Sequence, residues 1–453
     1  MDYSQQLGKE KISVLLYKFS VPAVIGMLVN ASYNIIDRIF IGRGVGSLGI
    51  AGITISFPFM ILMMAIGMLI GLGTTALISI RLGQQKHEEA ELIMTNGMVL
   101  LILSSLLLSI VGLVFLNPLL QLFGASEDVL PYASEYMRII LVGAVFMGTS
   151  FGMNNFIRAE GNPKTAMLTI IIGAVLNIIL DPIFIFTFKL GLSGAALATI
   201  LAQAVSAIWV LSYFIKGPSL LKIHAKNLKI KLHITKQILA IGSAPFAMQF
   251  AASIMNIILN KSLSVYGGDI AISAMGIVNS IGMMILMPIF GINQGAQPII
   301  GYNYGARKFE RVKQTLKTGI IVATIVVLIG FIVTRLFPEA LIGLFNNKDV
   351  ELIRIGSQAL TVFFVFLPII GFQIVSAGYF QAVGKPKQAM ILSLSRQVLL
   401  LIPALLILPR YFGLVGVFLA GPVSDLGSSL LTGFWLYLEM RGLSSKRAEI
   451  KQE

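Results

Sequence analysis

Two carboxylates, Asp37 and Asp181, lie inside strongly hydrophobic stretches of this sequence. An ionisable side chain in a membrane helix costs roughly 2.5–3.5 kcal/mol on insertion scales, so its presence predicts a functional site. Asn177 precedes Asp181 by four residues, which places both side chains on one face of a helix. That face is acidic and rich in oxygen atoms, and it therefore suits the binding of a proton or a small cation.

The composition indicates a polytopic membrane protein. Of the 453 residues, 56% are hydrophobic and 12% are charged, whereas soluble domains are about 25% charged. The absence of cysteine excludes disulfides and thiolate chemistry, and the three histidines all fall in charged loops. A carboxylate must therefore handle any protons. We expect no cofactor, only a coupling ion, H⁺ or Na⁺.

Twelve segments are apolar and long enough to cross a bilayer as helices, which takes roughly 17–25 residues. Glycine, proline and charged residues mark the turns between them. The approximate centres of these segments are Met27, Met63, Ser104, Phe146, Ala174, Gln203, Ala251, Met287, Ile325, Phe366, Leu399 and Leu426.

Lysine and arginine indicate the orientation. With the N-terminus placed in the cytoplasm, the inner segments contain 24 of the 34 Lys and Arg residues, which predicts two cytoplasmic termini. The longest polar stretch, 216–236, is basic, and we interpret it as a cytoplasmic connector rather than a nucleic-acid site. The predicted location is the cell (plasma) membrane, as a multi-pass protein with a cytoplasmic tail at 441–453.

The second half of the chain repeats the first at an offset of 222–223 residues. Residues 156–167 match 379–390, and 191–198 match 413–420. A repeat of six spans keeps its topology, so the halves are parallel repeats with a substrate site expected at their interface. We therefore predict an all-α polytopic membrane protein with twelve transmembrane helices in two six-helix lobes, the N-terminal lobe at 1–215 and the C-terminal lobe at 237–440.

The two lobes differ in their charges. The acidic pair belongs to the first lobe only. At the position of Gln203, the second lobe has Asp425, and it carries Arg396 one helix earlier. Because both charged residues lie deep in their spans, we interpret Arg396 and Asp425 as a candidate structural ion pair.

Four motifs resemble the multidrug and toxic compound extrusion (MATE) family, and its DinF-like branch in particular. They are Tyr-Asn-Ile-Ile-Asp at 33–37, Asn177 with Asp181-Pro182, and the segments 158–163 and 194–199. The resemblance covers nearly the whole chain. It implies export of organic, often cationic compounds in exchange for protons or sodium. It also implies a cation-coupling site, open to sodium, at Asp37, Asn177, Asp181 and Thr199, with Tyr136, Asn34 and Gln203 as candidates for lining the cavity.

Burial disfavours the charged form of a carboxylate, and two close acids titrate as a pair. We therefore expect a proton or sodium at Asp37 and Asp181 to weaken the binding of a cationic substrate, with Pro182 as a bending point. The structural alternatives are a salt bridge from Asp37 to Arg38, a fixed acid at Asp181, and ordinary interhelical hydrogen bonds from Thr199 and Tyr136.

Other functions stay open at this stage. A flippase for a lipid-linked precursor has a similar architecture but needs a cationic cavity, and export of a dedicated metabolite is a second alternative. A channel or receptor fits the tandem repeat less well. No motif of an enzyme lies in a loop large enough to build a site. We expect small organic substrates, a lipid environment, no nucleic-acid partner and a monomer.

Overall fold

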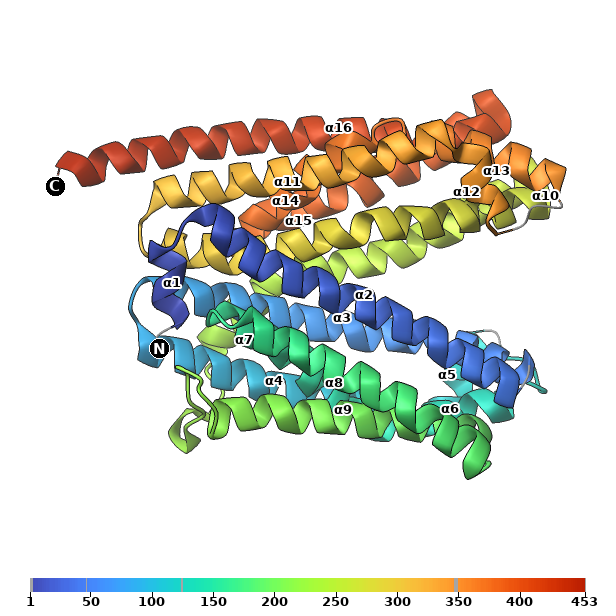
Figure 1. The fold of residues 1–453 in the computed structure, drawn as a ribbon, viewed down its shortest axis with the longest axis horizontal. Helices are drawn as coiled ribbons and strands as arrows, with labels where there is room; N and C mark the ends of the chain where they lie inside the picture. Colours follow the sequence, from blue (N-terminus) through green and yellow to red (C-terminus); the bar gives the residue numbers. More distant parts are fainter. Residues whose placement is uncertain (1–2, 46, 124, 346–348, 453) are drawn as a thin grey trace. The chain divides into compact units, whose positions relative to one another are not determined.

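The computed structural model describes residues 3–45, 47–123, 125–345 and 349–452, without the side chains of 3–4, 34–35, 38, 42, 47–48, 50, 269 and 444–452. These parts of the chain are helices joined by turns and, after α9, by a longer connector, with no strand (Figure 1). In chain order the elements are α1 (Tyr3–Lys9), α2 (Ile12–Gly44), α3 (Ser47–Gly83), α4 (His87–Val114), α5 (Leu116–Leu122), α6 (Leu130–Val142), α7 (Ala144–Ala159), α8 (Pro163–Pro182), η1 (Ile183–Thr187), α9 (Gly191–Ile215), η2 (Ala225–Asn227), α10 (Leu232–Gly305), α11 (Phe309–Leu336), α12 (Pro338–Gly343), α13 (Val350–Phe363), α14 (Leu367–Ala382), α15 (Pro386–Leu394), η3 (Ser395–Leu401) and α16 (Ile402–Gln452).

The helices in the described part of the chain provide twelve spans. Nine are long and apolar enough to cross a membrane by themselves, and two bent pairs, α6 with α7 and α13 with α14, make one span each. The segment Pro386–Leu443 has 58 residues, about twice what a bilayer needs. It is interrupted by non-helical backbone at Gly413, with φ 57° and ψ −137°, and therefore forms two spans.

The backbone repeats the duplication that the sequence predicts. Residues with positive φ, a region that is rare outside glycine, recur at offsets of 222–223 residues. Gln85 (φ 60°) corresponds to Arg307 (φ 55°), and Gly161 (φ 103°) corresponds to Gly384 (φ 73°). The bent spans are also equivalent, because each is the fourth span of its half, with bends of 57° and 52°.

The chain forms two compact units. Unit 1 comprises Met1–Lys9 and Ile25–Gly242, and unit 2 comprises Glu10–Val24 and Ser243–Glu453. Residues 12–24 of α2 thus pack in unit 2, and residues 232–242 of α10 pack in unit 1. The connector after α9 belongs to unit 1. The lobe boundaries that we drew from the repeat stay a prediction.

Close helix crossings hold these two exchanged segments. In unit 1, a Cβ on Gly242 of α10 would lie 1.7 Å from the carbonyl oxygen of Leu69 on α3. In unit 2, a Cβ on Gly295 would lie 2.7 Å from the backbone nitrogen of Ser20 on α2. Only glycine allows backbones to approach this closely, as is common between membrane helices.

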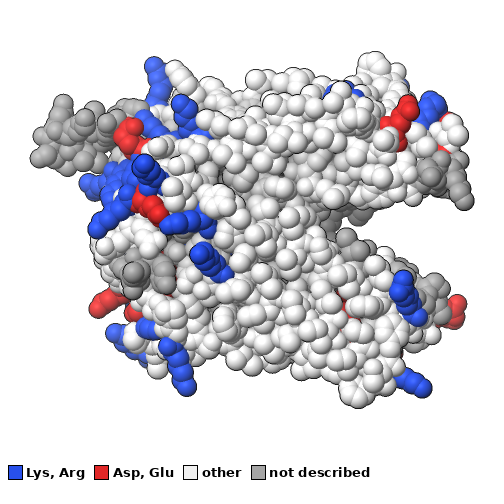
Figure 2. Space-filling model, viewed as in Figure 1, with Lys and Arg blue, Asp and Glu red and all other residues white. Residues whose placement is uncertain are grey.

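On the face that Figure 2 shows, most charged side chains lie near the ends of the helices. The long sides of each unit are largely uncharged on this face. In unit 1, loops that we predict to be cytoplasmic share one end, because the backbone nitrogen of Lys222 donates to Glu91 (2.9 Å) and that of Leu220 donates to Glu160 (3.0 Å). The exposed apolar sides suit lipid.

Candidate functional site

Asp181 and Asn177 lie together near the end of α8, in unit 1. Both side chains are buried, with 0% and 2% of their surface exposed. The side-chain nitrogen Nδ2 of Asn177 donates to Oδ1 of Asp181 at 3.3 Å. The four-residue spacing therefore produces the contact that the sequence predicts, one helical turn apart.

Thr199 joins this pair from the neighbouring helix α9. Asn177 Nδ2 also donates to Thr199 Oγ1, at 3.4 Å, and Thr199 in turn donates to the carbonyl oxygen of Ala195 at 3.0 Å. The contacts to Asn177 are at the long end of the hydrogen-bond range. α9 comes close because Gly194 has no side chain, and a Cβ there would lie 2.8 Å from the carbonyl carbon of Phe184.

Asp37 reaches the same site from α2. Its carboxyl group lies close enough to that of Asp181 for the two acids to interact electrostatically. Two carboxylates have no hydrogen to share unless one of them is protonated, so this contact itself provides a place for a proton.

Two contacts fix the register between α2 and α8. A Cβ on Gly26 would lie 2.9 Å from Cδ1 of Ile170, and one on Gly44 would lie 2.2 Å from Cγ2 of Ile185. Asp37 follows Gly26 by eleven residues, and Asp181 follows Ile170 by eleven, which is about three helical turns on each helix. The two helices therefore run parallel, and the acids face each other along the line of contact between α2 and α8, which we call the seam.

The helix changes character directly after the site. Residues 183–187 form the π-helix η1, with the backbone nitrogen of Phe188 donating to the carbonyl oxygen of Ile183 at 2.9 Å. Pro182 has no N–H to continue the α-helical ladder, and π-turns are frequent at functional sites. Pro182 was the predicted bending point, and the change of helix type follows directly after this residue.

The site holds buried oxygen atoms that lack protein donors. Oδ2 of Asp181 and Oδ1 of Asn177 have no hydrogen-bond partner among the described residues. Leaving buried acceptors unpaired is unfavourable by about 1–3 kcal/mol each. A proton on the carboxyl pair, or a small cation among these oxygens and Thr199, would satisfy them. The described residues contain no group of three or more His, Cys, Asp or Glu that could hold a metal ion.

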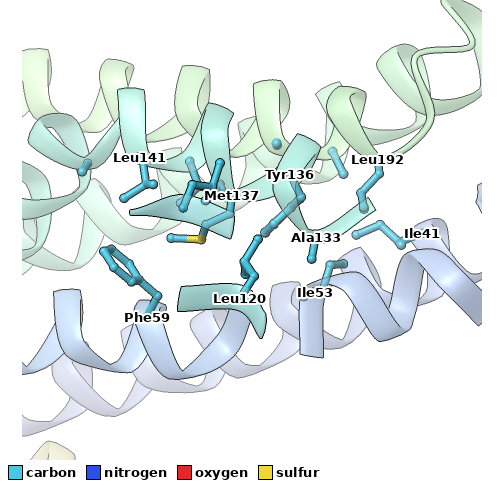
Figure 3. Packing of buried hydrophobic residues seen from close by; sticks show 14 of the residues in the cluster. Ile41, Ile53, Phe59, Leu120, Ala133, Tyr136, Met137, Leu141 and Leu192 are labelled. Atoms are coloured by element: carbon cyan, nitrogen blue, oxygen red, sulfur yellow. The ribbon is translucent and has the colours of Figure 1, made fainter. Parts of the chain in front are cut away.

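The remaining candidates in unit 1 are Tyr136 on α6, Gln203 on α9 and Asn34 on α2. Tyr136 is 2% exposed and packs in a hydrophobic cluster with Leu120 and Ala133 (Figure 3). Gln203 accepts a hydrogen bond from Ser150 at 2.5 Å and so links α9 to α7. The side chains of Asn34 and Arg38 lie outside the part of the chain that the structure describes. That Tyr136, Asn34 and Gln203 line a cavity stays a prediction.

Arg396 and Asp425 form an ion pair in unit 2. Nε of Arg396 lies 2.5 Å from Oδ1 of Asp425, and the arginine side chain is 22% exposed while the aspartate is 1% exposed. The pair joins η3 to α16, at the place where the first unit has the uncharged Gln203.

Glu160 is a buried acid that we did not predict as a site residue. It is 0% exposed, in the turn between α7 and α8, and it accepts from Tyr213 (2.6 Å), Ser219 (2.6 Å) and the backbone nitrogen of Leu220. Burial raises the pKa of Glu160, and the hydrogen bonds from Ser219, Tyr213 and Leu220 act in the opposite direction. The sequence feature that could have identified Glu160 is the presence of an acid directly before the turn Gly161-Asn162-Pro163.

An internal repeat of membrane helices with paired acids inside the first repeat defines a membrane carrier. The sequence model of the MatE family matches residues 22–183 and again 245–406, once in each half. The chain therefore belongs to the MatE family, whose members are transporters and not enzymes.

Relatives support the family across the whole chain. A solved structure of the MATE multidrug transporter DinF-BH is 44% identical, with a TM-score of 0.87, and the match covers 95% of this chain and 96% of that one. A crystal structure of MATE in the bent conformation is 26% identical, with a TM-score of 0.93, covering 99% of both. Multidrug export protein MepA of Staphylococcus aureus (strain MSSA476) is 29% identical over 409 residues, 90% of each chain. The predicted fold of twelve helices in two lobes, and the resemblance to MATE transporters, are confirmed.

Proposed function

We propose that this protein exports organic, mainly cationic compounds in exchange for protons or sodium ions, by alternating access. Multidrug efflux is the function of family members that it resembles over 90–95% of its length. The observation that carries the proposal is the interaction of Asp37 with Asp181 inside apolar helices, where Asn177 and Thr199 supply neutral polar contacts.

The carboxyl pair is the coupling element of this proposal. When ionised, Asp37 and Asp181 repel each other and attract an organic cation. A proton or sodium ion removes that repulsion and that attraction together, so the coupling ion and the substrate compete. Since α2 and α8 meet at these residues and η1 begins after Pro182, ion binding changes how the two helices pack.

We also propose the location, orientation and oligomeric state of the protein. Both termini lie in the cytoplasm, as the basic loops require, and the protein acts as a monomer in the plasma membrane. Sodium, where it replaces the proton, binds at Asp37, Asn177, Asp181 and Thr199.

The proposal is tested in liposomes that contain the purified protein and a fluorescent organic cation. An imposed pH or sodium gradient drives export by the wild type, and Asp37→Asn or Asp181→Asn abolishes the gradient dependence while the variants keep wild-type melting temperatures. Asp128→Asn, in the exposed turn before α6, is the matched control and exports normally. The proposal is contradicted if the export rate depends on neither gradient. It is also contradicted if both site variants export at the wild-type rate.

A further inference from the structure

The guanidinium of Arg396 uses little of its hydrogen-bonding capacity. An arginine has five N–H donors, and the structure gives Arg396 one hydrogen bond, from Nε to Asp425 Oδ1. Its nitrogens Nη1 and Nη2 therefore carry donors that no described residue uses. They are not sealed in the packing either, because the side chain retains 22% exposure.

Asp425 also uses only part of its hydrogen-bonding capacity. Its second oxygen, Oδ2, is buried and accepts no hydrogen bond from the described residues. A side-on pair through Nε alone is weaker than the two-point arrangement that arginine and carboxylate prefer. As a purely structural ion pair, this geometry would leave both partners poorly satisfied in an apolar medium.

The neighbouring helix surfaces add further unused polar groups. Ser429 Oγ and Thr432 Oγ1 follow Asp425 at four and seven residues on α16, so they share its face, and both are buried without a hydrogen-bond partner among the described residues. Oε1 of Gln397, next to Arg396, is also buried without a hydrogen-bond partner among the described residues. The polar groups thus continue beyond the ion pair.

A local change of helix type places Arg396 here. The π-helix η3 begins at Ser395. The carbonyl oxygen of Leu392 accepts from Ser395 Oγ at 2.8 Å and from Gln373 Nε2 at 3.4 Å. Side chains thus use an acceptor that a regular helix would keep for its own ladder. π-turns of this kind recur at functional sites, where they redirect a side chain.

The depth of the pair excludes a role at the membrane surface. Arg396 lies ten residues from the start of its span at Pro386, roughly 15 Å along the helix, and the hydrocarbon core is about 30 Å thick. Lipid head groups do not reach this depth, so the unused donors are left for water or for a solute that enters the protein.

We infer that Arg396, with Asp425 beside it, is a substrate-contact site in unit 2 that binds a carboxylate on exported molecules through Nη1 and Nη2. Guanidinium matches carboxylate in shape and charge, and Asp425 keeps the arginine from being an unpaired charge when no such substrate is bound. This role rests on the proposed function and extends it, because the protein would then accept zwitterions as well as plain cations.

Two dyes that differ in one group test the site. Rhodamine 6G is an ethyl ester with a net positive charge, and hydrolysis of the ester gives the free carboxylic acid, a zwitterion at neutral pH. Binding of each dye to the purified, detergent-solubilised protein is followed by fluorescence anisotropy. The readout is the ratio of the two Kd values, acid over ester, which cancels changes that affect both dyes alike.

Substitutions on the two sides of the pair move this ratio in opposite directions. Arg396→Gln raises it about tenfold, the size expected for a lost charge-assisted hydrogen bond. Asp425→Asn lowers it about threefold, because the competing carboxylate is gone. Arg410→Gln, which removes an exposed arginine elsewhere in unit 2, is the control and leaves the ratio unchanged.

The double variant R396Q/D425N tests the site even where Arg396→Gln does not fold, because it removes both charges and leaves no unpaired charge inside the protein. It raises the ratio as Arg396→Gln does. A ratio that stays at the wild-type value in R396Q, or in the double variant where R396Q does not fold, overturns the site. So does a ratio that moves in the same direction in R396Q and D425N.

Failure of the proposed function is measured separately. Gradient-driven efflux of the ester from liposomes reports on export, whereas the Kd ratio needs no gradient. An altered ratio without gradient-driven efflux contradicts the export mechanism and supports the carboxylate site. Efflux with an unaltered ratio contradicts the carboxylate site alone.

Discussion

Asn177 holds the carboxyl group of Asp181 from one helical turn earlier, with Nδ2 3.3 Å from Oδ1. The same nitrogen is 3.4 Å from Thr199 Oγ1. One amide therefore connects the acid on α8 to the hydroxyl on α9, and the orientation of Asp181 toward Asp37 depends on it.

Replacing Asn177 should impair coupling more than replacing Thr199. Asn177→Leu removes the donor to Asp181, and losing a buried hydrogen bond of this type is worth about 1–3 kcal/mol, so gradient-driven efflux should slow about tenfold or more. Thr199→Val keeps the shape of the side chain and the bond from Asn177 to Asp181, so its rate should fall less. Initial rates in liposomes measure both. Wild-type rates in Asn177→Leu would show that the amide has no part in coupling.

The buried Glu160 should make stability depend on pH with a definite sign. Because its pKa is raised above the ordinary value of 4.5, the folded state binds the proton more tightly than the unfolded state. The stabilisation is therefore complete below pH 4.5 and is lost as pH rises through the raised pKa. The melting temperature of the wild type should fall over this window relative to that of Glu160→Gln.

The choice of Glu160→Gln rests on the hydrogen-bond network. Ser219 Oγ is 2.6 Å from Glu160 and also 2.6 Å from the carbonyl oxygen of Leu221, so it can accept from a glutamine amide and donate to Leu221. Glu160→Ala offers no such replacement and should lower the melting temperature at every pH. Parallel melting curves for the wild type and Glu160→Gln across the pH range would contradict the assignment.

Two glycines of α10 should respond oppositely to alanine. A Cβ on Gly242 would lie 1.7 Å from the Leu69 carbonyl oxygen, whereas a Cβ on Gly276 meets nothing within 4 Å. Gly242→Ala must push backbones apart, and we expect a loss of about 3 kcal/mol or more. Gly276→Ala should be neutral or stabilise the helix by up to about 1 kcal/mol. Thermal unfolding in detergent compares them, and equal melting temperatures would contradict the close crossing.

The seam between α2 and α8 offers a test by rescue. Gly44→Ala places a methyl group 2.2 Å from Cγ2 of Ile185, a branched side chain that cannot turn away easily. The seam should open, and transport should fall severalfold. Gly26→Ala meets only the terminal Cδ1 of Ile170, at 2.9 Å, and should be tolerated better.

Removing the obstructing methyl groups should restore the seam. Ile185→Ala leaves a cavity in a buried position by itself, but combined with Gly44→Ala it makes room for the new methyl group. The double variant should therefore transport faster than Gly44→Ala alone. If it transports more slowly than either single variant, Gly44 and Ile185 are not in register in the working protein.

The sequence determined the spans and their repetition. Long apolar segments punctuated by Gly, Pro and charge are sufficient for twelve membrane helices, because an isolated backbone in lipid must form a helix to satisfy its polar groups. It also determined that Asn177 and Asp181 touch, since a four-residue spacing is a local property of any helix.

Tertiary structure alone decided the rest. The meeting of Asp37 with Asp181, the burial of Glu160 under Tyr213 and the crossing at Gly242 join residues far apart in the chain. In the π-helices η1 and η3, backbone nitrogens donate to a carbonyl oxygen five residues back rather than four. The packing of neighbouring helices decides which of these bonds forms. Hydropathy and periodicity describe one helix at a time, whereas these contacts depend on how several helices fit together.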